Sequence, residues 1–351
     1  MRARDLGVTI GEHPTGPHNA ITDVPGVRVG HTTLQGDGIN TGVTVVVPHD
    51  DIWTEPVFAG AHVLNGSGEL TGLEWIRESG ELTTAIGLTN THSVGVVRDG
   101  LVAEQVRVRG DGAYWSLPVV GETYDGFLND INGFHVRPEH VRSALAAAAD
   151  GPVAEGNVGG GTGMICHQFK GGIGTASRVN GHTVGVLVQA NHGRRDRLRI
   201  NGVPVTQPEV PLPAHPPGYL PGSGSIIVII ATDAPLLPHQ CRRLAQRSAL
   251  AVGRLGGAGE QYSGDLMFAF STGNRGIPPY GGEDTARAAS EIPLRMVGPQ
   301  RMDLLFDLTI EATEEAIVNA MVSAETVTGY RGFTAHAIDH DLLASALGEN
   351  A

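Results

Sequence analysis

Short apolar runs separated by glycines recur through the first half of the chain and predict β-strands. They lie at residues 42–50, 61–66, 83–90 and 92–100. Between the second and third runs, residues 70–80 have the spacing of a helix that ends at Gly80. A further helix is predicted at 138–151, where Pro138 lies in the first turn and Gly151 follows an alanine-rich body.

The second half of the chain alternates strands and helices more regularly. Residues 182–191 and 264–274 predict strands, and residues 225–232 are apolar at nearly every position, as in a strand buried on both faces. Residues 238–257 have helical spacing. Their apolar face consists of Cys241, Leu244, Ala245, Ser248, Val252 and Leu255. A last helix is predicted at 312–329, with acidic residues in its first turn. This order predicts an α/β protein.

Residues 206–224 are rich in proline and lack apolar periodicity, so they predict an exposed connection. This connection is the one plausible domain boundary. The predicted strands on either side, however, look too buried to fold alone. We therefore expect residues 1–351 to form a single globular domain.

Composition and charge narrow the classes of function. Glycine contributes 50 of the 351 residues, about twice its usual share, so close backbone packing is expected. The 24 basic and 37 acidic residues give a formal net charge of −13, which argues against nucleic acid or an anionic membrane surface as a partner. The two cysteines, Cys166 and Cys241, show no metal-ligand spacing and suit a reducing compartment. Because no signal-peptide or membrane-spanning pattern is seen, a cytoplasmic protein is expected.

Two kinds of ligand site are disfavoured by the sequence. The glycine-rich run 156–177 lacks the Walker pattern around Lys170, and it lacks the strand-to-helix order of a dinucleotide site. A nucleotide-binding enzyme that uses this run stays as a minor alternative. His336 and His340 have helical spacing beside Asp341, but the glutamate of a metalloprotease helix is absent. Neither a metal nor an organic cofactor is expected.

Ser225 follows Gly224 at the start of the most apolar predicted strand. Turn preferences alone make this Gly-Ser step a loop feature, and the Gly-x-Ser-x-Gly elbow of many serine hydrolases is absent. Cleavage of the bond before Ser225 offers another route to an active serine. The new α-amine has a pKa of about 7.7–8.0 and can act as the base for its own hydroxyl. Gly224 has no side chain to hinder the approach of a hydroxyl to its carbonyl.

Four long motifs carry a resemblance to a known family. They read HNAITDVPGVRVGHTT, GNVGGGTGMICHQFKGGIGTAS, VGVLVQANHG and GSGSIIVIIATDAPLLPHQ. The chain resembles, over nearly its whole length, the DmpA/BapA-type family of L-aminopeptidase/D-esterase and β-aminopeptidase enzymes. The resemblance implies an αββα sandwich of N-terminal-nucleophile type. It also implies a precursor that cleaves itself between Gly224 and Ser225 into an α chain, 1–224, and a β chain, 225–351. The two chains are expected to stay together, as a homo-oligomer with four such pairs.

The resemblance also implies catalytic roles. Ser225 is the nucleophile for both self-cleavage and catalysis, and Asn191 in QANHG matches an oxyanion-hole asparagine. Ser263 and Asp265 in YSGDL match a serine and an acid that contact the new amine and hydroxyl. Asp265 is one methylene shorter than the glutamate of the β-aminopeptidase members. Without the resemblance, Asn191 is interpreted as a strand-end cap and Ser263 as part of a turn.

The same resemblance implies a substrate pocket. Glu122 and Tyr124 in GETYDG match pocket-lining residues, with Glu122 as a partner for the substrate ammonium and Trp115 as an apolar wall. Glu69 and Asp125 compete with Glu122 for the ammonium.

The expected protein is a serine hydrolase that removes N-terminal residues from small peptides, amides or esters through an acyl-enzyme on Ser225. The sequence does not decide among L-, D- and β-amino-acid substrates. The main alternative is an unprocessed family member that acts as a binding or scaffold protein.

Overall fold

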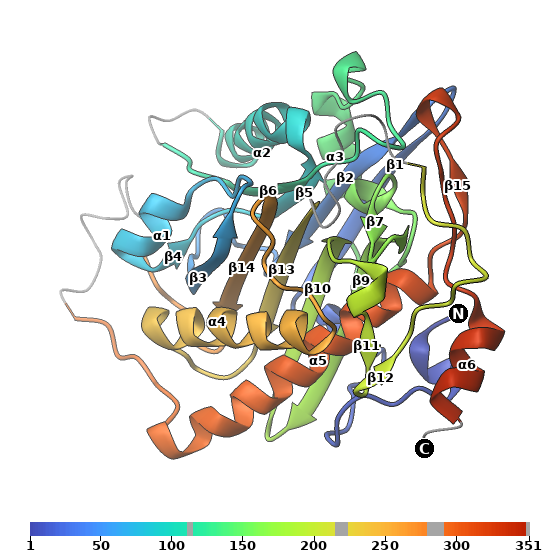
Figure 1. Ribbon diagram of the computed structural model, residues 1–351. Coiled ribbons are helices and arrows are strands. Elements are labelled where there is room, and N and C mark those ends of the chain that lie inside the picture. The colour runs from blue at the N-terminus through green and yellow to red at the C-terminus, as the bar shows by residue number, and fades with distance from the viewer. Residues whose placement is uncertain (111–114, 215–223, 279–290, 349–351) are drawn as a thin grey trace.

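Two β-sheets lie face to face, and helices cover the outer side of each (Figure 1). The computed structural model describes residues 1–110, 115–214, 224–278 and 291–348. The order of layers is helix, sheet, sheet, helix, which confirms the αββα sandwich that the resemblance implied.

The smaller sheet has the strand order β1-β2-β5-β6. Its strands are β1 (Arg28–Gly36), β2 (Ile39–Val47), β5 (Ile86–Asn90) and β6 (Val119–Thr123). Helices α2 (Val94–Arg109) and α3 (Pro138–Ala146) lie against its outer face. The packing is close, because a Cβ on Gly30 of β1 would lie 2.0 Å from the carbonyl oxygen of Ala144 in α3.

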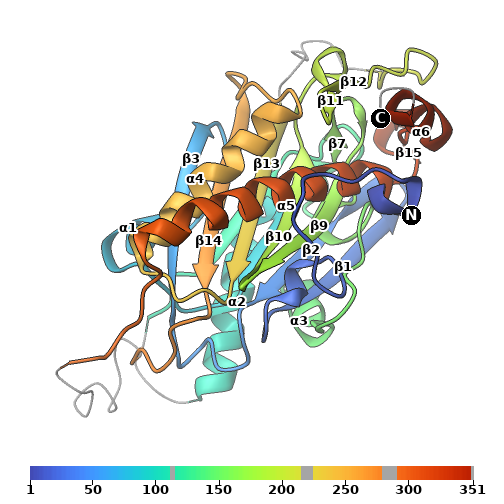
Figure 2. The same cartoon turned by 90° about the horizontal axis from the view of Figure 1, so that it is seen from below.

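The larger sheet has the strand order β4-β3-β14-β13-β10-β9. Its strands are β3 (Val57–Gly66), β4 (Glu81–Leu82), β9 (Gly172–Asn180), β10 (His182–Asn191), β13 (Gly224–Thr232) and β14 (Ser263–Ser271). Helices α4 (Pro238–Arg254) and α5 (Met302–Val322) cover its outer face, with α4 over β3 and β14 and α5 over β9 and β10 (Figure 2).

Shorter elements lie at the edges of the sandwich. They are α1 (Leu73–Ser79), α6 (His340–Gly348) and the strand pairs β7 (Ile165–Cys166) with β8 (Phe169–Lys170), β11 (Arg199–Ile200) with β12 (Val203–Pro204), and β15 (Val327–Thr328) with β16 (Thr334–Ala335).

Strand β13 is apolar at successive positions because both of its faces are buried. Ile226 and Val228 join the core under α4 and α5, whereas Ile227 and Ile229 join the core between the two sheets. Strand side chains alternate between faces, so Ser225 shares the inter-sheet face with Ile227.

One predicted strand is wrong. Residues 91–93 form a short 3-10 helix and α2 begins at Val94 instead, where the buried side chains Val94, Val97 and Leu101 follow a helical spacing. Their valines suggested a strand, but the hydrophobic contact with β5 and α3 decides in favour of a helix.

Two predicted helices have different ends. The predicted helix 138–151 stops at Ala146, because Ala149 forms a β-bridge with Val29. The predicted helix 312–329 runs from Met302 to Val322, so its acidic residues lie in mid-helix rather than in a first turn.

Two acids in the middle of α5, Glu311 and Glu315, are explained by a buried arginine. The side chain of Arg178 in β9 is fully buried and donates to Glu311 at 3.0 Å and to Glu315 at 2.7 Å. It also donates to the carbonyl oxygen of Ile10 at 2.6 Å. Arg178 therefore ties the N-terminal segment, the larger sheet and α5 together.

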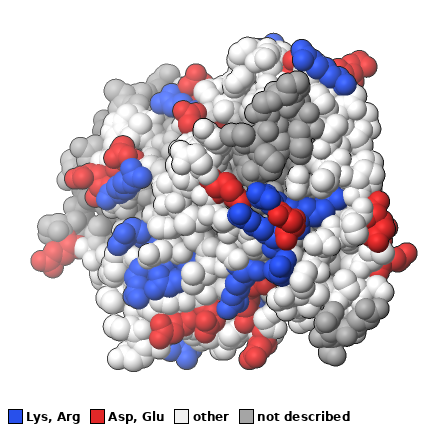
Figure 3. Space-filling model, in the orientation of Figure 1, with Lys and Arg blue, Asp and Glu red and all other residues white. Residues whose placement is uncertain are grey.

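Part of the proline-rich connection, residues 215–223, lies outside the described residues. Among the helices that the structure describes, none is long and apolar enough to cross a membrane. On the face shown in Figure 3, described basic and acidic side chains are interspersed.

Candidate active site

Ser225 lies where three strands of the larger sheet meet. It is the second residue of β13, it is only 5% exposed, and it pairs with Asn191 of β10 on one side and Gly264 of β14 on the other. The backbone N–H of Gly264 donates to Ser225 Oγ at 3.1 Å. The hydroxyl is therefore held in place by backbone that belongs to a neighbouring strand.

The backbone around position 224 leaves room only for glycine. A Cβ there would lie 2.1 Å from the carbonyl oxygen of Asn191 and 3.1 Å from Cα of His192. Gly224 is not among the glycines with positive φ, so close approach rather than backbone conformation excludes a side chain. The Gly-Ser step is thus the start of a strand, not a turn.

The side chain of Asn191 is fixed at both ends. Its Nδ2 donates to the carbonyl oxygen of Tyr124 at 3.0 Å, and its Oδ1 accepts from the N–H of Ile165 at 2.7 Å. An amide carries two N–H donors, so one remains to serve a substrate oxygen. This fixed orientation is what an oxyanion donor requires.

Ser263 and Asp265 form a second pair one strand away. Ser263 Oγ donates to Asp265 Oδ1 at 2.6 Å, and Asp265 Oδ2 is buried without a hydrogen-bond partner among the residues that the structure describes. Burial raises the pKa of Asp265 to about 6, although the Ser263 hydrogen bond lowers it. Ser263, Asp265 and Met267 occupy alternate positions of β14, so their side chains share the face that α4 and α5 cover. The Ser225 side chain lies on the opposite face of the sheet, so Ser263 and Asp265 flank the backbone of Ser225. In the described part of the chain, no hydrogen bond joins the side chains of this pair to the side chain of Ser225.

Glu122 is buried beside this centre. Glu122 Oε1 accepts from the N–H of Glu69 at 2.9 Å, and Oε2 accepts from the hydroxyl of Thr91. A Cβ on Gly68 would lie 3.0 Å from Glu122 Oε1 and 3.1 Å from Cα of Gly264, which places the carboxyl close to Ser225's backbone partner. Burial raises the pKa of Glu122, so the site favours an arriving cation.

The competing acids are less suited to bind an ammonium group. Asp125 is fully buried, and its two oxygens accept from the amides of Asn129 and Asn90, each at 3.0 Å. The side chain of Glu69 is exposed, and only its backbone reaches Glu122.

The two predicted aromatic residues differ in their relation to the site. Tyr124 is 42% exposed and is joined to Asn191 through its carbonyl. Trp115 is 40% exposed and packs edge-on against Trp75 of α1, with ring centroids 5.0 Å apart. Among the described contacts, none joins Trp115 to Ser225 or Asn191.

Comparison with known proteins decides the family. The family sequence model described as "Peptidase family S58" matches residues 19–335 of the chain. The chain belongs to peptidase family S58. It is therefore a hydrolase.

Relatives of this S58 peptidase cover nearly all of its length. It is 48% identical to the beta-peptidyl aminopeptidase BapA of Sphingosinicella microcystinivorans, over 99% of this chain and 91% of that protein. A beta-aminopeptidase structure from Burkholderia sp. has a TM-score of 0.93, 54% identity and 99% coverage of both chains. The l-aminopeptidase d-ala-esterase/amidase of Ochrobactrum anthropi has a TM-score of 0.89 and 44% identity, over 99% of this chain and 98% of that one. That structure is described as a prototype for the serine aminopeptidases and a variant of the Ntn hydrolase fold, so the predicted serine aminopeptidase class is confirmed.

The glycine-rich run of the S58 peptidase folds around its own lysine. Lys170 is fully buried, and its Nζ donates to the carbonyl oxygens of Gly161, Met164 and Gly171 at 3.3, 2.8 and 2.7 Å. All three N–H donors of the ammonium are used, which argues against the phosphate-binding alternative.

Sequence reasoning missed several backbone and side-chain partners in the S58 peptidase. Gly264 holds the Ser225 hydroxyl, Ile165 orients Asn191, and Thr91 orients Glu122. Gly264 and Ile165 act through their backbone N–H groups, and the identity of a residue does not reveal such a role. Thr91 lies directly after β5, and only the parallel pairing of β5 with β6 brings it to Glu122.

Proposed function

We propose that the chain cleaves its own Gly224–Ser225 bond and then acts as an aminopeptidase with Ser225 as its N-terminal nucleophile. The observation that carries this proposal is the position of Ser225, buried between Asn191 and Gly264 at the start of a rigid strand. In the self-cleavage step, Ser225 Oγ bonds to the Gly224 carbonyl carbon while the C–N bond breaks and the nitrogen takes the proton. Water hydrolyses the ester and leaves a free α-amine on Ser225.

The same centre is suited to turnover. The α-amine takes the hydroxyl proton as Ser225 attacks a substrate carbonyl, and it returns the proton to the leaving group. The second Nδ2 hydrogen of Asn191 stabilises the oxyanion, while Ser263 and Asp265 hold the amine. Glu122 binds the substrate ammonium, and Tyr124 and Trp115 line the outer pocket.

Substrates in this proposal are small peptides, amides or esters with a free amino group. The names of the relatives span β-peptidyl, L-amino-acid and D-alanyl substrates, so the shared requirement is the ammonium group and not one configuration. The processed molecule is proposed to be a homo-oligomer containing four α–β pairs, which size-exclusion chromatography with light scattering tests.

Intact mass spectrometry under denaturing conditions tests the self-cleavage. The chain of 36.7 kDa should give species of about 23 and 13 kDa in proportion to residues 1–224 and 225–351, with Ser225 at the start of the smaller one. Ser225→Ala should remain intact, and the matched control Ser223→Ala should be cleaved like the wild type. A single intact wild-type species that hydrolyses no amino-acyl p-nitroanilide would instead support the binding or scaffold alternative.

Glu122→Gln should raise KM about tenfold and change kcat little, because the charge-assisted bond to the substrate ammonium is lost in ground and transition states alike. Steady-state kinetics on an amino-acyl p-nitroanilide measures this effect. Glu69→Gln, which changes the neighbouring exposed acid, is the matched control and should leave KM unchanged. An unchanged KM in Glu122→Gln contradicts the assigned role.

A further inference from the structure

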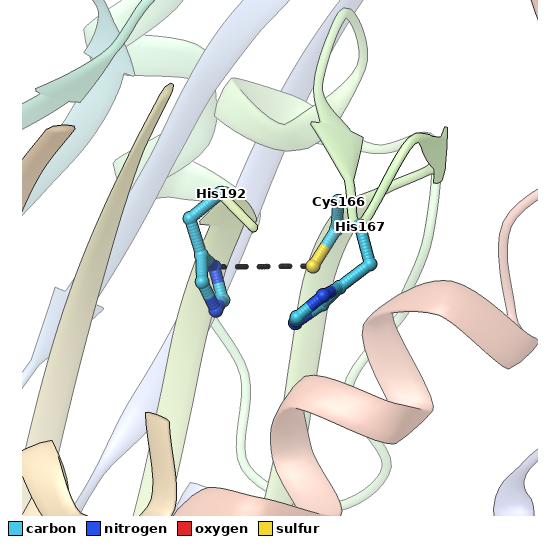
Figure 4. A group of neighbouring side chains, drawn as sticks. All are labelled: Cys166, His167 and His192. Atoms are coloured by element: carbon cyan, nitrogen blue, oxygen red, sulfur yellow. Dashed lines mark hydrogen bonds between the residues drawn. The ribbon is translucent and has the colours of Figure 1, made fainter. Parts of the chain in front are cut away.

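Three side chains that could ligate a metal meet next to Asn191. Cys166 ends β7, His167 follows it in the turn to β8, and His192 follows the last residue of β10. All three are buried, and one possible ligand atom from each lies within 4.8 Å of the others. Figure 4 shows the three side chains pointing toward one another. The spacing along the chain gave no hint of this group, because His192 lies 25 positions after His167.

Both imidazoles have a buried nitrogen that nothing satisfies. His167 Nδ1 lies 3.1 Å from the carbonyl oxygen of Arg194, so Nδ1 carries the hydrogen and Nε2 carries a lone pair. Among the described residues, Nε2 of both rings is buried without a hydrogen-bond partner. Of the two, only Nε2 of His167 is a candidate ligand, because Nδ1 is the His192 nitrogen that faces the Cys166 thiol, at 3.9 Å. A ring N–H donated to a backbone carbonyl is the usual support for a metal-ligating histidine.

We propose that Cys166, His167 and His192 bind a divalent cation of the zinc class. One thiolate and two imidazoles suit Zn²⁺ and not Mg²⁺ or Ca²⁺, which prefer oxygen ligands. Cys166 Sγ lies 3.9 Å from His192 Nδ1, and zinc bond lengths at a tetrahedral angle require about 3.6 Å. Binding forms the metal–sulfur bond and releases one proton from the thiol.

The cation would join the two segments that hold Asn191. Ile165 donates to the Asn191 side chain at 2.7 Å, and the N–H of His167 donates to the carbonyl oxygen of His192 at 2.6 Å. A metal on Cys166 and His192 adds a bond between the same two segments. The ion therefore stabilises the fold around Asn191, and this inference does not depend on self-cleavage.

Cobalt substitution in the untagged full-length chain tests the site. The protein is expressed in cobalt-supplemented minimal medium, so that Co²⁺ is present while the buried site folds. The wild type should retain about one Co²⁺ per chain and show thiolate-to-cobalt absorption, which Zn²⁺ in place of Co²⁺ abolishes. Cys166→Ala should lose the absorption, whereas the matched control Cys241→Ala, another buried free cysteine, should keep it.

His167→Gln is the second variant, and it leaves the thiol in place. It should retain at least about tenfold less cobalt than the wild type after dialysis against a competing chelator. The proposal is overturned if the wild type shows no thiolate-to-cobalt absorption, or if the absorption persists in Cys166→Ala.

Discussion

Gly224→Ala should remain an intact chain of 36.7 kDa when the wild type is cleaved. The new Cβ would lie 2.1 Å from the carbonyl oxygen of Asn191, and that atom is strand backbone that cannot turn away. Strands β10 and β13 must separate where Ser225 pairs with Asn191, so the hydroxyl loses its alignment with the bond to be broken. We expect the cleaved fraction to fall at least tenfold and the free energy of unfolding to fall by about 1–3 kcal/mol.

Gly253→Ala is the control for this substitution. Gly253 lies in α4, and nothing lies within 4 Å of the position that a new methyl group would take there. Alanine should therefore stabilise the helix by about 0.5–1 kcal/mol and leave cleavage unchanged. Mass spectrometry over a time course, together with thermal unfolding, measures both variants. Normal cleavage of Gly224→Ala would show that the two strands are not held as tightly as the structure indicates.

Asp265→Asn should lower kcat/KM of the cleaved enzyme about 100-fold, because the carboxylate no longer holds the amine that serves as the base. The wild-type rate should rise with pH as the amine, whose ordinary pKa is about 7.7–8.0, loses its proton. Asp265→Glu should recover most of the rate, and Asp196→Asn, an exposed acid paired with Arg194, should keep it. Rates are normalised to the cleaved fraction. A wild-type-like rate in Asp265→Asn contradicts the assigned role.

The same substitution should have the opposite effect on stability in the uncleaved chain. The pKa of Asp265 is raised from 3.8 to about 6 in the folded state, so its contribution to stability is present below about pH 4 and is lost as the pH rises through 6. In a Ser225→Ala background, which has no amine to pair with the carboxylate, Asp265→Asn should add about 2–3 kcal/mol at pH 8 and almost nothing at pH 4. Thermal unfolding at the two pH values measures the difference.

The sequence predicted those elements whose local pattern agrees with their final environment. Strand β13 is apolar throughout and buried on both faces, and the six residues chosen for the apolar face of α4 are all buried in the structure. Helix α2 was missed because its valines favour a strand locally, while packing on β5 decides otherwise. The first ten residues of α5 were missed because the acidic residues 314 and 315 were taken to mark a first turn, whereas Glu315 lies in mid-helix and pairs with Arg178, which is distant in sequence.

The candidate site likewise contains residues that the sequence predicted and residues that it did not. Ser225 and Asn191 lie in long motifs that resemble a family, and Ser263 and Asp265 were assigned by the same resemblance from the short stretch YSGDL. The structure gathers all four at one end of β13 and its neighbours. The roles assigned to them stay predictions. No motif contains both Cys166 and His192 at a ligand spacing, so only the packing of the β7–β8 turn against the end of β10 brings them together.

The strand order has a consequence for assembly. β13 belongs to residues 225–351, yet it lies between β10, from residues 1–224, and β14. Arg178 and its partners Glu311 and Glu315 likewise come from opposite sides of the proposed cut. After cleavage the two chains form one hydrophobic core, so unfolding becomes a dissociation. The melting temperature of the cleaved protein then rises with protein concentration, whereas that of an uncleaved monomer does not.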